Sequence, residues 1–378
     1  MAELLGKTFN VTIYEQGKAI GRKYLVAGKG GFNIAHNLDR TELYEKYSPT
    51  HFLQEAIQHF GVEELRTWYL KMGVPTYIGT SNRVFPEKGV SPANVLRAIK
   101  SRLAFLNVEI KTKHTFIGFS EEAQPILKHD ESNQIIDATY TVFCLGGGSW
   151  KVTGANSDWF APFNQLGVST LPFEASNCGL TINWPDSIST NHVGKPLKNI
   201  AIKCHDLSVK GEAVITNYGI EGNAIYPISS EIRKSFKSSI PAAITLDFKP
   251  MLSSVEIYKK LKKCQPSNYG KVLKLDTASM AIIKQFTTKE EFLSKEILSK
   301  TIKNISLPIA SLRPIEEAIS TVGGIEVENL TPHFSLKKYP HLFCIGEMVN
   351  WDAPTGGFLL QGCFSMAHQL ANKLLKQN

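Results

Sequence analysis

Three segments of this 378-residue chain share one pattern, in which an apolar strand runs directly into glycine or a carboxylate. They are TIYE, which ends at Glu15, YTVFCLGGGSW, whose glycines begin at Gly146, and HLFCIGE, which ends at Glu347. In an open α/β sheet the carboxyl ends of the strands together form the crevice that binds ligands. The pattern therefore predicts an α/β fold whose ligand crevice draws on both ends of the chain.

The alternation of predicted strands and helices favours a mainly parallel, layered sheet. Residues 9–15 alternate as a strand, and two helical stretches follow at 50–60 and 62–72. The segment SPANVLRAIKSRLAFLN predicts another helix, because Ser91 and Pro92 are typical of an N-cap and a first turn. Strands return after it.

Beyond residue 161 the sequence pattern changes: it predicts short strands and turns first, and then lysine-rich helices at 253–303. We therefore predict a Rossmann-like nucleotide-binding domain in two parts, residues 1–161 and 321–378. The residues between them, 162–320, are predicted to form an inserted β-barrel-like and helical domain that faces the substrate.

A final helix is predicted at 358–376. Its apolar residues recur at three- and four-residue steps, which is typical of a helix with one face against a core. That stripe consists of Leu360, Phe364, Ala367, Ala371 and Leu374.

The charge of +8 and the pI near 9.0 permit an anionic partner. The lysines are dispersed, however, and no Arg/Lys stripe is interleaved with aromatic residues, which argues against a nucleic-acid partner and favours a solvated basic surface. The six cysteines stand singly without C-x-x-C spacing, so no zinc or other metal site is predicted. No run approaches the ~20 apolar residues of a membrane span, and no signal-like segment is seen at the N-terminus, so we expect a cytoplasmic protein without membrane contact.

The glycine run at Gly146, Gly147 and Gly148 leaves no side chain to obstruct a ligand, and Ser149 adds a small donor. The spacing is not G-x-G-x-x-G, so an ordinary tight turn after an apolar strand explains the run equally well. Both interpretations stay open.

The third segment carries more chemistry. After Glu347 a loop with Trp351 leads to Thr355-Gly356-Gly357, and a long helix begins at once. The free N–H groups and the positive dipole end of that helix favour an anion or the electron-rich edge of a ring, such as that of a reduced flavin. Glu347 is placed to accept hydrogen bonds from sugar-like hydroxyls.

Long stretches of the sequence resemble one known family. GRKYLVAGKGGFNIAH, NRVFP, CLGGGSW, TNYGIEGNAIYPIS, STVGG and GEMVNWDAPTGGFLLQGC are similar to the YhiN-like NAD(P)/FAD-dependent oxidoreductases, some of which are labelled aminoacetone-oxidase-type flavoproteins. The resemblance covers nearly the whole chain. It implies FAD bound in an extended pose across the two ends of the chain.

The resemblance also implies cofactor-binding residues. Glu15 would hold the adenosine ribose, and Phe116 would lie near the adenine through its backbone. The loop beside the pyrophosphate and flavin would comprise Arg22, Lys23, Gly28, Gly30, Gly31 and Asn33. The inner crevice and the sites for the ribityl chain and ring would comprise Gly146, Gly147, Ser149, Trp150, Gly346, Glu347, Thr355, Gly356, Gly357 and Phe358.

Family members begin with a short apolar strand and a G-G-G-x-A-G-L-type turn, and the helix that follows reads much like MAELLGK. The resemblance therefore implies that Met1 lies inside that first helix. We expect the first strand and the pyrophosphate-binding turn to be missing from the chain as numbered.

The remaining candidate site residues are considered mainly as contacts to the substrate. Tyr218 and Glu221 could project toward the flavin, although such residues in a turn are more often surface residues, and Trp351 could stack on the ring or belong to the core. His36 could touch flavin or substrate, or be structural. No catalytic residue is assigned, because the cofactor performs the electron transfer.

We expect an FAD-dependent oxidoreductase that transfers a hydride between a small organic substrate or NAD(P)H and the flavin. NAD(P)H would bind transiently, because no second dinucleotide-binding unit is present. The alternatives are a flavin-dependent RNA-modifying protein, favoured by the basic pI, and a non-catalytic flavin-binding protein.

Overall fold

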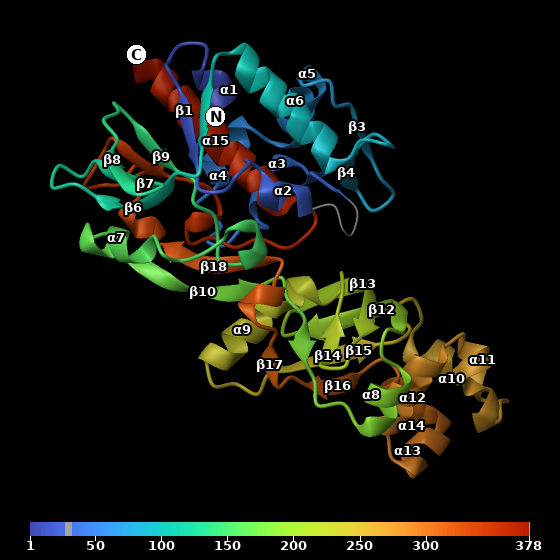
Figure 1. Ribbon diagram of the computed structural model, residues 1–378. Coiled ribbons are helices and arrows are strands. Elements are labelled where there is room, and N and C mark those ends of the chain that lie inside the picture. Colours follow the sequence, from blue (N-terminus) through green and yellow to red (C-terminus); the bar gives the residue numbers. More distant parts are fainter. Residues whose placement is uncertain (27–31, 378) are drawn as a thin grey trace. The chain divides into compact units, whose positions relative to one another are not determined.

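The computed structural model describes residues 1–26 and 32–377, and the chain divides into two compact units. Unit 1 comprises Met1–Glu174 and Ser320–Asn378, and unit 2 comprises Ala175–Ile319 (Figure 1). The insert was predicted at residues 162–320, whereas unit 2 begins later in the chain, at Ala175. Each unit has its own core.

Two parallel pairs of strands form the centre of unit 1. β1 (Thr12–Glu15) pairs with β5 (Glu109–Thr112), and β9 (Thr141–Phe143) pairs with β19 (Leu342–Cys344). In the described residues the two pairs are separate sheets. β19 is buried throughout, as expected of a short apolar strand covered on both faces.

Smaller sheets surround these pairs. Two are antiparallel with three strands each, in the orders β2-β4-β3 and β6-β7-β8, and a further pair is formed by β10 and β18. Their bounds are β2 Ala35–His36, β3 Thr76–Ile78, β4 Arg83–Pro86, β6 Thr115–Phe119, β7 Pro125–His129, β8 Ser132–Ile135, β10 Thr170–Ser176 and β18 Ser320–Ile325.

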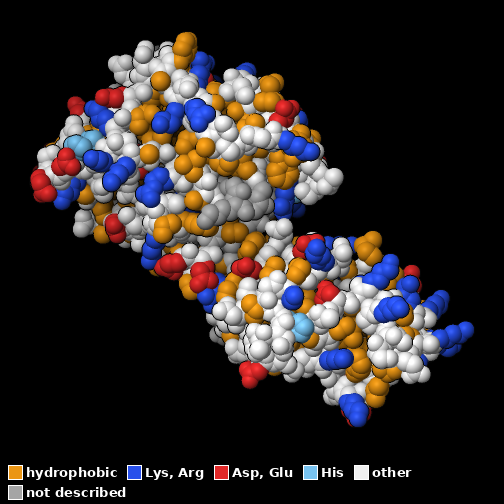
Figure 2. Space-filling view, turned by 45° about the vertical axis from the view of Figure 1, so that its right-hand side comes forward, with side chains coloured by type: hydrophobic (Ala, Val, Ile, Leu, Met, Phe, Trp, Pro, Cys, Tyr) orange, Lys and Arg blue, Asp and Glu red, His pale blue; other side chains and the backbone are white. Residues whose placement is uncertain are grey.

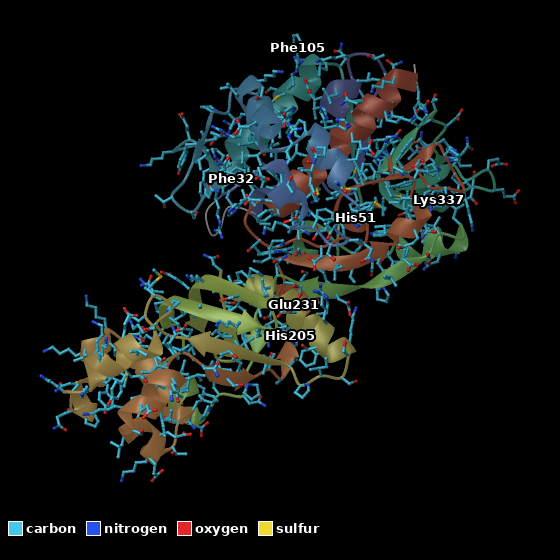
Figure 3. The ribbon with its side chains drawn as sticks, turned by 180° about the vertical axis from the view of Figure 1, so that it is seen from behind. Phe32, His51, Phe105, His205, Glu231 and Lys337 are labelled. Carbon is cyan, nitrogen blue, oxygen red and sulfur yellow. The ribbon has the colours of Figure 1, made fainter. Side chains whose placement is uncertain are left out.

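The helices of unit 1 include the one predicted from SPANVLRAIKSRLAFLN. It is α6, and its start is confirmed: Ser91 is the N-cap and accepts a hydrogen bond from the Asn94 backbone N–H at 3.3 Å. Its last residue, Phe105, points into solvent (Figure 3). The helices are α1 Ala2–Leu5, α2 Arg22–Val26, α3 Arg40–Tyr44, α4 Gln54–His59, α5 Val62–Lys71, α6 Pro92–Phe105, α7 Phe160–Gln165 and α15 Phe358–Gln377.

The last helix, α15, is confirmed, but its buried face differs from the predicted stripe. Leu360, Phe364 and Ala367 are only partly buried, whereas the polar residues Gln361 and Ser365 are fully buried. Both polar side chains donate to the Phe60 carbonyl, at 3.1 and 2.7 Å. Hydrogen bonding of this kind makes burial of polar groups possible, and the apolar pattern alone does not reveal it.

Unit 2 is built on an antiparallel sheet of seven strands in the order β16-β15-β12-β13-β14-β11-β17. Within the described residues its end strands are not paired with each other, so the sheet is open. This corrects the expected barrel-like insert. The strands are β11 Leu180–Thr181, β12 Pro196–Cys204, β13 Leu207–Ile215, β14 Gly219–Glu221, β15 Ala243–Asp247, β16 Ile305–Pro308 and β17 Ser311–Leu312.

Helices complete unit 2. α9 carries Glu231 and Ser235, and the Ser235 hydroxyl lies 2.8 Å from Nε2 of His205, which follows β12 (Figure 3). Short helices gather between β15 and β16 in the chain (Figure 1). The bounds are α8 Asp186–Asn191, α9 Ser229–Lys237, α10 Ser254–Leu261, α11 Tyr269–Leu273, α12 Thr277–Gln285, α13 Lys289–Leu293 and α14 Lys295–Thr301.

Across residues 1–26 and 32–377, no helix combines the length and the apolar character that crossing a membrane would require.

Candidate functional site

Three residues that were predicted separately meet in unit 1. The Lys23 ammonium on α2 lies 2.7 Å from a carboxylate oxygen of Glu347 and 3.1 Å from the Ser149 hydroxyl. Glu347 follows β19, and Ser149 follows β9. Because β9 and β19 are parallel neighbours, their carboxyl ends deliver both residues to the same edge. The structure therefore brings together three segments that are far apart in the sequence.

Thr321 on β18 completes this cluster, and the sequence analysis did not identify it. Its backbone N–H donates to the second carboxylate oxygen of Glu347 at 3.2 Å, and its hydroxyl accepts from the Gly148 N–H at 3.0 Å. Thr321 is 1% exposed, and Ser149 is fully buried. The only sequence signal was its membership of STVGG, one of the family-like segments.

Gly147 must be glycine for a steric reason. A Cβ there would lie 2.3 Å from the Thr321 hydroxyl oxygen and 2.8 Å from the carboxyl carbon of Glu347. The glycine run is thus more than a turn at this residue, because it allows the backbone to approach the cluster closely.

Two other glycines of the crevice adjoin open space. Gly146 and Gly346 both have positive φ, and a Cβ on Gly146 would meet no atom within 4 Å. A Cβ on Gly346 would meet only the Cys363 sulfur, at 3.9 Å. Room beside backbone at the ends of β9 and β19 is what the ring or ribityl chain of FAD requires, so the residues present fit that cofactor.

The start of α15 lies against β2. The ring of Phe358 stacks on His36 at a centroid distance of 5.2 Å and an interplanar angle of 15°. Nδ1 of His36 is buried without a hydrogen-bond partner among the described residues. A Cβ on Gly356 would lie 3.6 Å from that nitrogen and 3.5 Å from Nε of Arg83. An unpaired ring nitrogen beside the glycine turn is a second feature that a ligand could satisfy.

Burial lowers the pKa of His36, and the neighbouring charges of Arg83 and Lys46 lower it further. The imidazole is therefore neutral at pH 7, and one of its nitrogens can accept a hydrogen bond.

Trp351 belongs to the wall behind the crevice. Its indole N–H donates to the Gly346 carbonyl at 2.8 Å, its ring packs at 5.8 Å from that of Tyr47, and it is 2% exposed. The Tyr47 hydroxyl in turn donates to the Phe358 carbonyl at 2.7 Å. These contacts hold the glycine turn, and stacking of Trp351 on a ligand stays a prediction.

The predicted site residues Glu15 and Arg22, near the N-terminus, make hydrogen bonds to the backbone. Glu15 ends β1 and accepts a hydrogen bond from the Gly17 N–H at 2.6 Å. The exposed Arg22 donates to the Val152 carbonyl at 2.7 Å, just after Trp150, which has a left-handed backbone. Arg22 is thus joined to the loop that follows the glycine run.

The structure also gives the positions of other predicted site residues. The side chain of Phe116 packs at 5.0–5.9 Å from Phe119, Phe143 and Phe163, so only its backbone is left for the adenine. Asn33 and Thr355 are half-buried. Gly28, Gly30 and Gly31 lie outside the described residues.

Tyr218 and Glu221 lie in unit 2 and contact each other. The Tyr218 hydroxyl donates to a carboxylate oxygen of Glu221 at 2.5 Å, and the Arg313 guanidinium lies 4.0 Å from the centroid of the Tyr218 ring. Arg313 is itself bound by both oxygens of Glu317, at 2.6 and 2.8 Å. Burial raises the pKa of Tyr218, and the hydrogen bond and charge of Glu221 raise it further. The phenol therefore stays protonated.

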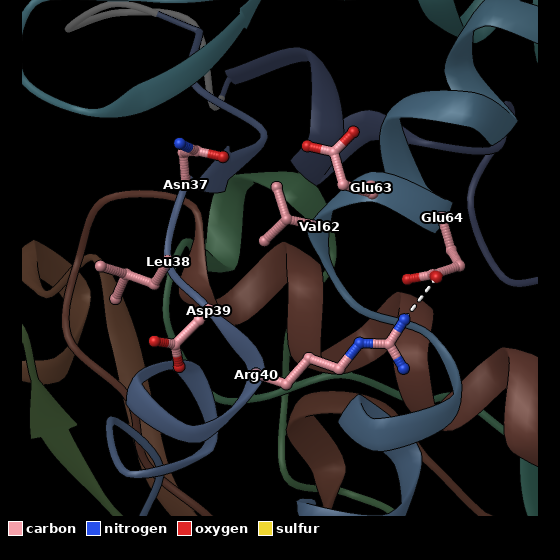
Figure 4. Close-up of a pocket in the computed structure, with 7 residues that line it drawn as sticks. All are labelled: Asn37, Leu38, Asp39, Arg40, Val62, Glu63 and Glu64. Carbon is pink, nitrogen blue, oxygen red and sulfur yellow. Dashed lines mark hydrogen bonds and ion pairs between the residues drawn. The ribbon is translucent and has the colours of Figure 1, made fainter.

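A hollow of about 280 Å³ in unit 1 is lined by the start of α5 and the segment before α3 (Figure 4). Its charged groups are already engaged. Arg40 pairs with Glu64, Glu63 pairs with Arg66, and Asp39 caps α3. The lining residues are Asn37, Leu38, Asp39, Arg40, Val62, Glu63 and Glu64. Within the described part of the chain, no group of three or more His, Cys, Asp or Glu is arranged to hold a metal ion.

The fold and this site define a mixed α/β protein with a Rossmann-like FAD-binding fold. The sequence model of the family described as "HI0933-like protein Rossmann domain" matches residues 2–373, and the chain belongs to that family. The family groups flavin-dependent oxidoreductase-like proteins.

Two curated relatives match almost the full length. A 3-dehydro-bile acid delta(4,6)-reductase of Clostridium scindens is 22% identical over 375 residues, covering 95% of this chain and 91% of that protein. A ribosomal RNA dihydrouridine synthase of Haemophilus influenzae is 20% identical over 392 residues, covering 99% of this chain and 94% of that protein.

A solved structure shares the fold. The 3-ketosteroid delta1-dehydrogenase from Sterolibacterium denitrificans has a TM-score of 0.50 and 12% identity, covering 100% of this chain and 97% of that one. At this identity the likeness shows the fold alone.

Gly147→Ala should lower the free energy of unfolding by about 1–3 kcal/mol, because the added methyl group overlaps the Thr321 hydroxyl and Glu347. Urea-induced unfolding followed by circular dichroism measures the change. Gly118→Ala is the matched control, since a Cβ there meets nothing within 4 Å. Equal stability of the two variants would contradict the packing described for the crevice.

The pH dependence of stability should include a contribution from His36. Its folded pKa lies below the unfolded value of about 6.5, so between the two values the unfolded chain binds more protons and protonation favours unfolding. Stability is therefore complete above about pH 6.5 and is lost as the pH falls towards the folded pKa.

His36→Gln should flatten this dependence in urea unfolding at about pH 7.5 and about pH 5.5. The exposed His51 supplies the control variant His51→Gln, which should keep the slope of the wild type. A slope in His36→Gln that is as steep as in the wild type would refute the assignment.

Proposed function

We propose that this chain is an FAD-dependent oxidoreductase that transfers a hydride between the flavin and a small organic substrate, with NAD(P)H as a transient reductant. The observation that carries the proposal is the meeting of Lys23, Ser149 and Glu347 at the carboxyl ends of β9 and β19, beside glycines that adjoin open space. When bound, FAD would supply the N5 position that takes up or releases the hydride.

The roles of the chain's own residues follow from their chemistry. Glu347 accepts hydrogen bonds and would hold ribityl hydroxyls, while Lys23 keeps its carboxylate in place. The N–H groups at the start of α15 would face an electron-rich ring edge. Glu15, at the end of β1, would hold the adenosine ribose. His36 offers a neutral imidazole nitrogen to the same region.

The substrate side of the proposal draws on unit 2. Tyr218 keeps its proton, and Glu221 fixes the direction of the hydroxyl, so the phenol is suited to donate a proton to the substrate carbon next to the one that receives the hydride. Relatives named as a bile acid reductase and a dihydrouridine synthase support reduction as the direction of the reaction. We propose a cytoplasmic location for such chemistry.

RNA modification is the second candidate function. The relatives named as ribosomal RNA dihydrouridine synthases, from Haemophilus influenzae and Escherichia coli, cover 99% and 97% of this chain. The net charge of +8 is compatible with a polyanionic substrate.

The visible absorbance spectrum of the purified chain tests the cofactor, and Glu347→Gln tests the site. The substitution keeps the shape of the side chain but removes the charge that faces Lys23, so FAD affinity should fall about tenfold or more. Glu328→Gln, at an exposed carboxylate of unit 1, is the control and should retain the affinity of the wild type.

Flavin bands in the spectrum of the purified chain would support the flavoenzyme proposal. Colourless, folded protein would reject it.

Tyr218→Phe should slow reoxidation of the NADPH-reduced flavin by a 3-oxo-4-ene steroid probe by about 100-fold, because a general acid contributes roughly that much. Flavin content should stay unchanged. Tyr258→Phe, on α10, is the control. Unchanged kinetics in Tyr218→Phe would remove the proton-donor role and leave FAD binding intact.

A further inference from the structure

Most of the net charge of the chain lies in one small part of unit 2. Residues 253–303, which hold α10 to α14, contain eleven lysines, five acidic residues, and no arginine or histidine, a formal charge of +6 out of the +8 of the whole chain. We call this part the lysine module. Lysine side chains, coloured blue, are spread over this part of the surface of unit 2 in Figure 2.

The acidic residues of the lysine module are mostly occupied by the fold. Three serve as caps: Glu256 accepts from the Ser253 N–H, Asp276 from the Ser279 N–H, and Glu291 from the Thr288 N–H, each at 2.7–2.8 Å. Glu296 pairs with Lys300 at 3.1 Å. Glu290 is the fifth. Five carboxylates stand against eleven lysines, so the excess positive charge of the module is not neutralised within it.

The lysines themselves are largely unpaired and exposed. Two are exceptions: Lys300 pairs with Glu296, as noted above, and Lys303 pairs with the buried Asp247 at 2.7 Å. Among the described residues, eight exposed lysines have no carboxylate within ion-pair distance. They are Lys259, Lys260, Lys262, Lys263, Lys271, Lys274, Lys284 and Lys289.

Helix dipoles account for only part of this set. Lysines in the last turn of a helix stabilise its negative end, as Lys259, Lys271 and Lys284 do. Lys289 and Lys295, however, are the first residues of α13 and α14, where the dipole opposes a cation. Lys295 also donates to the Lys262 carbonyl at 2.9 Å. Helix dipoles therefore do not explain the lysines at these two positions.

From this placement we infer that the lysine module binds the phosphate backbone of RNA. Lysine is a point charge suited to phosphates, whereas the bidentate reading of bases is typical of arginine, which the module lacks. The contact would be electrostatic and independent of sequence. The ammonium groups come from several helices and loops, so they cover an area, as a polyanion requires, rather than converging on one small anion.

RNA fits better than a lipid surface. Helices that lie on membranes are amphipathic along their length, and the longest helix of the lysine module, α12, has nine residues. The choice of RNA over DNA rests on the second candidate function proposed above, whereas phosphate binding by the module does not depend on flavin chemistry. The inference departs from the sequence-based expectation of a solvated basic surface without a nucleic-acid partner.

The test uses the full chain and a fluorescein-labelled RNA hairpin, titrated between about 50 and 200 mM salt. The variant carries Lys262→Gln, Lys263→Gln, Lys274→Gln and Lys289→Gln. The control carries the same number of substitutions at exposed lysines of unit 1, Lys71→Gln, Lys88→Gln, Lys100→Gln and Lys128→Gln. Circular dichroism and flavin content confirm that both are folded.

The wild type should bind the hairpin in the micromolar range with a steep salt dependence. In the lysine-module variant the slope of log K against log salt should fall by about three, and affinity at low salt should drop about tenfold or more. The control should keep most of its affinity.

Three results would overturn the inference. The wild type could fail to bind the hairpin at low salt, or the two variants could lose affinity equally, which would indicate a diffuse charge effect. Binding to phosphatidylserine vesicles in place of the hairpin, lost in the lysine-module variant alone, would assign the surface to lipid. Flavin binding is read separately, so its failure would leave this result interpretable.

Discussion

The ion pair between Lys23 and Glu347 is the contact on which the candidate site depends. It joins a helix near one end of the chain to the segment after the last strand, at 2.7 Å. Ser149 adds a hydrogen bond to Lys23, and Thr321 adds one to Glu347. A partly buried pair is retained only when its neighbours satisfy both charges, and here the neighbours come from the middle of the chain and from the return strand. The arrangement of the crevice is thus shared among four segments.

The sequence predicted the parts of the fold whose signals are local. Ser91 with Pro92 marked the start of α6, and the apolar runs before Gly146 and Glu347 marked two strands that prove to be parallel neighbours. These signals depend on propensity and on backbone freedom, which act within a few residues. The glycine run was ambiguous from sequence; the structure shows a packing role for Gly147 against Thr321, and a ligand role for the run stays a prediction.

Long-range contacts were beyond the reach of sequence patterns. The buried face of α15 was misplaced because Gln361 and Ser365 are polar, and only the Phe60 carbonyl explains why they are inside. The hydrogen bond between Thr321 and Glu347 joins residues 26 positions apart and has no signal in the local sequence pattern either. The charge of residues 253–303 was visible in the sequence, and the structure adds that three of their acidic side chains cap helices.

The way unit 2 closes has a consequence for how the chain folds. β9 and β19 pair residues about 200 positions apart, so their contact closes a very long loop. Within unit 2 the pairing of Leu180 with Leu312 and the hydrogen bond from the Ile319 N–H to the Asn177 carbonyl hold both ends of the insert together. Once unit 2 has formed, only residues 144–174 and 320–341 remain in the loop between β9 and β19, so the loop is much shorter. We therefore expect unit 2 to form before β9 pairs with β19.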